Sequence, residues 1–138
     1  MSKSWTDTDL VFRQVHPQHW DGKNPNSVAF SPTPKDLDQL SVDDGSLVTA
    51  EQSWAHFTKS LGFQSVGTWA VSNGEILELS VLTLRADPIV DPINPVKSNS
   101  AHCVVDFSGL SSKGQRKKRA QELAIKASER GCQFQASE

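Results

Sequence analysis

The first two apolar segments of the chain lie close together, and this spacing limits how their strands can pair. Residues 10–16 alternate as a strand does, and Pro17 ends the segment. Residues 27–31 form the second segment, and the connection between them holds Gly22 and Pro25, which favour a loop. Parallel neighbours need a long crossover, usually a helix, and none fits here. The spacing therefore favours antiparallel pairing.

Further short apolar segments predict the rest of the sheet. Residues 32–34 carry two prolines around Thr33, which force an extended exit from the second segment. The polar, acidic residues 36–46 contain the strong turn signal Asp-Asp-Gly. Later strands are expected at residues 65–72, 81–85 and 102–107. The proline-rich loop 87–100 lies between the last two and could contain an edge segment around Ile89 and Val90.

Two helices are expected, with a third, shorter one. Thr49 is suited to cap a helix over residues 50–60, and Gly62 is suited to end it. Apolar residues at helical spacing predict a C-terminal helix over residues 112–130. Residues 75–79 favour a short helix over a hairpin. We therefore predict a single α+β domain with a mostly antiparallel sheet of about five strands, one central helix and one C-terminal helix.

Length and composition bound the class of protein. A chain of 138 residues, 36% hydrophobic and 22% charged, is expected to form one globular domain, here residues 10–138, preceded by a flexible arm at residues 1–9. The two cysteines, Cys103 and Cys132, are expected to be reduced, with Cys103 in the core. The N-terminus resembles no signal peptide and no segment is long enough to span a membrane, so we expect a cytoplasmic protein.

Polar side chains at the ends of the predicted strands indicate a pocket. Arg13 and His16 lie on the first strand, and His102 begins a later one. Ser31, Thr33 and Lys35 follow the second segment. Functional side chains concentrate at strand ends and loops, and these residue types suit an anion. Arg13 could instead form an internal ion pair with Asp106 or Glu51, and the histidines could cap loops.

The chemistry expected of this pocket is the binding of an anionic small molecule or nucleotide. Arg13, Ser31, Thr33 and Lys35 would bind it, and His16 and His102 could act as acid and base if the protein is an enzyme. No metal or cofactor is expected, because the sequence has no ligand spacing for zinc and no phosphate-binding glycine loop. It also has no Gly-x-Ser-x-Gly turn for a nucleophilic serine.

One looser pattern resembles a known family. An arginine on the first strand, Ser31 and Thr33 on the next segment, and a later glutamate resemble the arrangement in ADP-ribosyltransferase-like enzymes and toxins. The resemblance implies an activity on NAD with Arg13, Ser31 and Thr33, and with Glu75 or Glu78 as the glutamate. The segment from Glu75 to Glu78 departs from the family's characteristic late strand motif.

The charge distribution offers a second hypothesis. Residues 1–112 hold seven basic and thirteen acidic residues, whereas residues 113–138 hold seven and three. Five basic residues crowd the start of the C-terminal helix: Lys113, Arg116, Lys117, Lys118 and Arg119. They could contact nucleic-acid phosphates, an acidic partner protein, or the acidic residues 36–44 of this chain. A third hypothesis is an accessory subunit that covers Trp5 and Trp20 with a partner.

Overall fold

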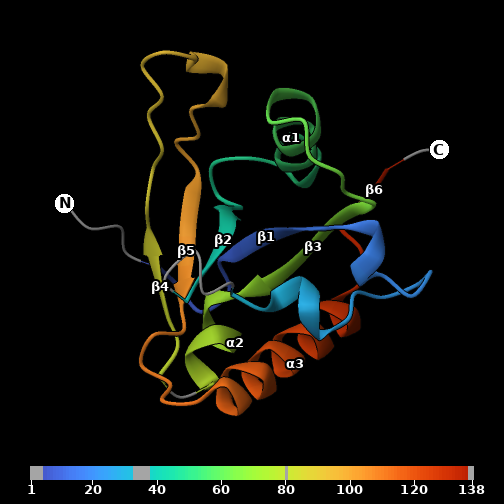
Figure 1. Cartoon of the computed structure of the whole chain (residues 1–138), viewed down its shortest axis with the longest axis vertical. Coiled ribbons are helices and arrows are strands. Elements are labelled where there is room, and N and C mark those ends of the chain that lie inside the picture. The colour runs from blue at the N-terminus through green and yellow to red at the C-terminus, as the bar shows by residue number, and fades with distance from the viewer. Residues whose placement is uncertain (1–4, 33–37, 80, 137–138) are drawn as a thin grey trace.

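Six strands form one sheet in which every neighbouring pair is antiparallel. The structure, a computed structural model, describes residues 5–32, 38–79 and 81–136. The strand order is β4-β5-β2-β1-β3-β6 (Figure 1). The strands are β1 (Leu10–Val15), β2 (Gln39–Asp44), β3 (Gly67–Ser72), β4 (Thr83–Ala86), β5 (His102–Asp106) and β6 (Phe134–Gln135). The predicted antiparallel α+β domain is confirmed, with one strand more than expected.

Helices lie on both faces of the sheet. α3 (Lys113–Arg130) contacts β3 on one face, while α1 (Ala50–Ala55) contacts β1 and β3 and continues into the π-helical turn η4 (His56–Ser60). The remaining helices are α2 (Asn73–Glu78) and the short 3-10 turns η1 (Pro17–His19), η2 (Ser27–Phe30) and η5 (Pro95–Lys97). Figure 1 shows α3 and α1 at opposite ends of the view, with the sheet between them.

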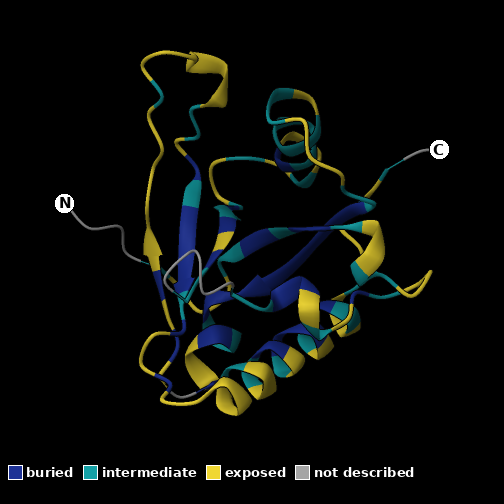
Figure 2. Ribbon diagram, viewed as in Figure 1, coloured by how far each residue is buried: buried dark blue, intermediate teal, exposed yellow. Residues whose placement is uncertain are grey.

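The main hydrophobic core lies between α3 and the sheet. Val11, Val15 and Trp69 from the strands are fully or almost fully buried, and Leu123 from α3 is buried with them. The predicted spacing of Ala120, Leu123, Ala124 and Ala127 is confirmed, since all four side chains are buried. Ser112 caps this helix by accepting from the Gln115 amide, and Gly131 follows it at a φ of 92°. Figure 2 shows the buried sheet between exposed outer surfaces.

Two predictions of local structure are wrong. Residues 27–30 form the 3-10 turn η2 instead of a strand, because the Asn26 side chain accepts from the Val28 amide and Phe30 turns into the core. The acidic segment contains the central strand β2, in which Leu40 and Val42 are buried on one face. The turn signal marks only the end of that strand, where Asp44 accepts from the Ser46 amide. Thr33 and Lys35 lie outside the described residues.

The sheet opens between β1 and β2, and this opening positions the site. The two strands pair only through Val11 with Asp44 and Phe12 with Asp43. β1 and β3 then diverge from β2, β5 and β4 (Figure 1). The connection of residues 87–101, here called the β4–β5 extension, projects beyond the sheet beside α1 and η4. Its two sides are joined by a bridge between Ile89 and Asn99.

The N-terminal residues that the structure describes contact the domain. Trp5 packs against the core, and the Asp9 carbonyl accepts from the Asn73 amide across 2.8 Å. Residues 1–4 lie outside the described part. Both cysteines are free, with Cys103 buried and Cys132 exposed. Among the described helices, none combines the length and the apolar character needed to cross a membrane.

Candidate functional site

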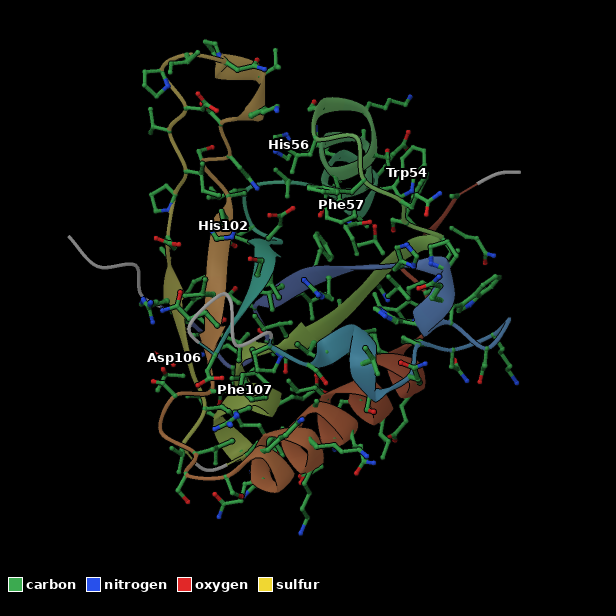
Figure 3. The ribbon with its side chains drawn as sticks, in the orientation of Figure 1. Trp54, His56, Phe57, His102, Asp106 and Phe107 are labelled. Carbon is green, nitrogen blue, oxygen red and sulfur yellow. The ribbon has the colours of Figure 1, made fainter. Side chains whose placement is uncertain are left out.

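A cavity of about 360 Å³ lies where the sheet opens, between β1, β2, η4 and the β4–β5 extension. We call it the main cavity. Three phenylalanines and three aliphatic residues supply its apolar wall: Phe12, Val42, Phe57, Leu61, Phe63 and Ile89. A volume of this size suits a small organic molecule. Figure 3 shows Phe57 and His56 on the helical turn and His102 on β5, around this region.

His102 is held in one orientation at the floor of the main cavity. Its Nδ1 lies 2.7 Å from the Asp87 main-chain oxygen and 3.4 Å from the Asp87 carboxylate. Because a carbonyl can only accept, Nδ1 carries the proton and donates it. In the neutral ring Nε2 therefore accepts from the Ser41 hydroxyl, which lies 3.1 Å away. The His102 side chain is only 13% exposed.

A network of polar side chains fixes the other elements around the cavity. Gln14 on β1 donates to Ser53 on α1 and to Thr68 on β3, each across 2.9 Å. Ser53 then donates to Asp43 on β2 across 2.6 Å, and Asn99 of the extension donates to the same carboxylate across 2.8 Å. Satisfied buried polar groups of this kind specify one arrangement of the elements that they join.

One residue of the cavity wall, His56, has a ring nitrogen whose hydrogen-bonding capacity is not satisfied. Its Nε2 is buried and has no hydrogen-bond partner among the described residues. Figure 3 shows the ring extending from η4 toward the β4–β5 extension, and His56 lines the main cavity. Burying a polar atom without a partner costs free energy, so the His56 ring would gain a hydrogen bond by turning its Nε2 toward a ligand in the cavity.

The charged side chains of the cavity wall differ in whether they already form hydrogen bonds or ion pairs within the protein. Asp43 accepts from Ser53 and Asn99 through its two oxygens. Asp91 accepts from the amides of Ile93 and Asn94 within its own turn. The Lys97 ammonium pairs with no carboxylate in the described part of the chain, and Lys97 also lines the cavity. The acidic wall groups thus have internal donors.

Arg13 lines the main cavity and also bridges the opening in the sheet. Its Nε donates to the Ala29 main-chain oxygen across 2.7 Å, and its Nη1 donates to the Ser41 main-chain oxygen across 2.9 Å. Asp106, considered above as its partner, instead pairs with Arg85 across 3.0 Å. Arg13 therefore has a structural role at the edge of the cavity.

His16 lies in an adjoining hollow of about 310 Å³, which shares Arg13, Phe57 and Phe63 with the main cavity. Its Nδ1 accepts from the Gln18 amide, and its ring lies 5.6 Å from that of His19. Burial, and then the neighbouring positive charges of His16 and Arg13, lower the pKa of His19. The surroundings of Arg13 and His16 therefore disfavour a further positive charge.

Ser31 lies apart from the main cavity. Its hydroxyl donates to the Ser27 main-chain oxygen, and the residue lines a separate hollow beside Lys113 and Lys117 at the start of α3. The structure therefore brings together Arg13 and His102 in one cavity, and Arg13 and His16 in the next. It does not place Ser31 among the residues of either hollow.

Two of the basic residues at the start of α3, Arg116 and Arg119, already form ion pairs within the chain. Arg116 lies 3.6 Å from the Asp38 carboxylate and donates to the Leu110 main-chain oxygen. Arg119 pairs with Glu122 across 2.9 Å. The predicted contact with the acidic half therefore exists through Arg116 and Asp38, whereas Lys113, Lys117 and Lys118 are exposed.

The glutamates of the ADP-ribosyltransferase-like pattern lie on α2. Glu75 completes the cap of that helix with Ser72 and pairs with Arg130 across 2.6 Å. Neither Glu75 nor Glu78 lines the main cavity. Within the described residues no group of three or more histidine, cysteine or acidic side chains is arranged to bind a metal ion.

Several residues of the site were not found by the sequence reasoning. Ser41 sits in an acidic segment with a strong turn signal, and His56 carried no sequence signal for a site because it is one of several half-buried positions on its helix. Asn99 lines the cavity only because the β4–β5 extension folds beside η4, and Asp87 of the same extension contacts His102. The alternation of Leu40 and Val42 is the one signal that could have placed Ser41 on the opposite face of a strand.

Comparison with known proteins assigns no family to the chain. No protein-family model matches it, and neither the curated proteins nor the solved structures include a significant match.

Proposed function

We propose that the protein binds a small anionic molecule with an apolar body in the main cavity. The observation that carries this proposal is the combination of an aromatic wall with the buried Nε2 of His56, which has no hydrogen-bond partner in the described part of the chain. Ligand pockets typically combine apolar walls with a few fixed polar groups. The apolar body would lie against Phe12, Phe57 and Phe63, and the polar end would face the imidazole.

The charges around the cavity support an anion over a cation. Arg13 and Lys97 line the cavity as cations, and His56 can donate from a protonated nitrogen. The carboxylates of Asp43 and Asp91 already accept hydrogen bonds from the protein. A cationic ligand would have to compete for these oxygens, whereas a carboxylate ligand would satisfy the His56 nitrogen.

The fixed ring of His102 supports a catalytic role for this binding site in addition to binding. Asp87 holds its Nδ1 proton, so the lone pair of Nε2 faces Ser41 and the cavity. A histidine in this state can accept a proton from a bound molecule or from the serine.

Calorimetric titration with 2-naphthoate tests the binding proposal, and 2-naphthamide is the neutral control ligand. We expect saturable binding of 2-naphthoate, with the amide about tenfold weaker because it lacks the charge. His56→Phe keeps an aromatic ring but removes both ring nitrogens, so we expect the Kd for 2-naphthoate to rise about tenfold.

Leu77→Ala is the matched control, because Leu77 is exposed on α2, away from the cavity. It should leave the Kd unchanged. Circular dichroism verifies that each variant is folded. No binding of 2-naphthoate at millimolar concentration, or equal affinity of the wild type and His56→Phe, would overturn the proposal.

A further inference from the structure

We propose that Ser41 is a nucleophile activated by His102, and that the protein hydrolyses carboxylic esters with an aromatic acyl group. This inference rests on the proposed binding of aromatic carboxylates, because the acid product of such an ester is the ligand proposed above. The arrangement consists of a serine, a histidine and an aspartate from three segments of the chain: β2, β5 and the β4–β5 extension.

The hydrogen bonds run in the direction that this chemistry requires. Ser41 Oγ lies 3.1 Å from His102 Nε2, and His102 Nδ1 donates to Asp87, 2.7 Å from its main-chain oxygen and 3.4 Å from its carboxylate. An active serine needs a base within hydrogen-bond reach and a third group that orients the base. Asp87 fixes the ring nitrogen that carries the proton, so the other nitrogen is free to accept one.

Ser41 is held firmly yet remains open to the cavity. It lies on β2 opposite Val104 of β5, and its main-chain oxygen accepts from Arg13 across 2.9 Å. The residue is exposed and lines the main cavity together with His102. A nucleophile placed on a paired strand is positioned more accurately than one on a loop.

The first half of the reaction transfers the acyl group to the serine. Ser41 Oγ attacks the carbonyl carbon of the ester, and its hydroxyl proton moves to His102 Nε2. The bond from the carbonyl carbon to the alcohol oxygen then breaks, and the leaving alcohol takes the proton from Nε2. The product is an acyl-serine, with His102 neutral again.

The second half consumes one water molecule. Water attacks the acyl carbon, and one of its protons moves to His102 Nε2. The bond from the acyl carbon to Ser41 Oγ breaks, and the serine recovers its proton from Nε2. Ester and water have become carboxylic acid and alcohol. His56, when its Nε2 is protonated, is a donor in the same cavity for the oxyanion that forms in both halves.

Covalent labelling tests the nucleophile separately from binding. Phenylmethylsulfonyl fluoride carries an apolar ring and sulfonylates an activated serine, with loss of fluoride. Mass spectrometry of the intact protein, followed by peptide mapping, locates the adduct. We expect one adduct, on Ser41, and none after Ser41→Ala. His102→Gln should slow the labelling about 100-fold or more, because the serine then lacks its base.

Ser100→Ala is the control, since Ser100 is an exposed serine on the β4–β5 extension and does not line the main cavity. It should label at the wild-type rate. The same set of variants is assayed for hydrolysis of 4-nitrophenyl 2-naphthoate, and Ser41→Ala and His102→Gln should both lose the activity above the uncatalysed rate.

Binding of 2-naphthoate by each variant distinguishes the two proposals. If the wild type binds 2-naphthoate but Ser41 is neither labelled nor needed for hydrolysis, the nucleophile is wrong and the binding site stands. If 2-naphthoate does not bind, the binding proposal fails as well. Labelling at Ser41 that is equally fast in His102→Gln would contradict the role of His102 as the base.

Discussion

Arg13 Nη1 donates to the main-chain oxygen of Ser41 across 2.9 Å, at the point where β1 and β2 separate. The Nε of the same guanidinium donates to Ala29 of η2 across 2.7 Å. One side chain thus joins β1 to β2 by a single hydrogen bond where the diverging strands no longer pair, and joins β1 to η2 by another. It also fixes the backbone of the residue that faces His102.

Replacement of Arg13 tests this structural role. Arg13→Ala leaves two carbonyl oxygens without their donors, and we expect a loss of about 2–4 kcal/mol in the free energy of unfolding, measured with urea. Arg13→Lys should recover only part of it, because one ammonium cannot reproduce the fork of the guanidinium. Wild-type stability in both variants would show that the bridge contributes nothing.

The hydrogen bond from Ser53 to Asp43 connects α1 to the sheet beside the cavity. Ser53→Ala removes the donor to this carboxylate and the acceptor for Gln14, so we expect a loss of about 1–3 kcal/mol in urea unfolding. The matched control is Ser100→Ala, at an exposed serine outside this network, which should stay within about 0.5 kcal/mol of the wild type. Equal stabilities of the two variants would argue against the network.

The ion pair between Glu75 and Arg130 predicts how stability depends on pH. Burial alone would raise the pKa of Glu75, but the hydrogen bonds and charge of Arg130 and the Ser72 amide lower it overall. A carboxyl whose pKa is lower in the folded protein stabilises it above the unfolded pKa, and this contribution disappears as the pH falls through the folded pKa.

Glu75→Gln keeps the helix cap and removes the charge. We expect the variant to lose about 1 kcal/mol at neutral pH and to match the wild type in acid, below the folded pKa of Glu75. Urea unfolding at neutral and acidic pH measures both differences. A constant difference across this range would contradict the assignment to charge.

The two thiols should differ in reactivity. Cys103 is buried, and partial burial raises the pKa of Cys132, which outweighs the hydrogen bonds that lower it. Less thiolate is then present at neutral pH, so 5,5′-dithiobis(2-nitrobenzoate) should modify Cys132 more slowly than free cysteine, and Cys103 only on unfolding. Rapid modification of two thiols in the folded protein would be inconsistent with the described packing.

The sequence predicted the elements whose signals are local. The C-terminal helix followed from the spacing of its buried face and from Gly131, and the helix beginning at Ala50 followed from its cap at Thr49. The turn η2 was missed because a run of three apolar residues does not distinguish a strand from a buried turn. β2 was missed because the acidic residues at its end obscured the alternation of Leu40 and Val42.

The candidate site was harder to predict, because it depends on contacts between distant segments. Arg13 and His102, both proposed from the sequence as pocket residues, line the main cavity. Ser41 and His56 had no local signal, since the former meets His102 across 61 residues of sequence. Such contacts follow from strand order and from the path of the β4–β5 extension, which periodicity does not encode.

The most direct test of the central claim is to map 2-naphthoate on the ¹⁵N-labelled protein by amide chemical shifts. We predict saturable shifts at Ser41, Phe57 and Asn99, the cavity residues from β2, η4 and the extension, and none along the exposed face of α3. Shifts confined to α3, or no shifts at millimolar ligand, would contradict binding in the main cavity.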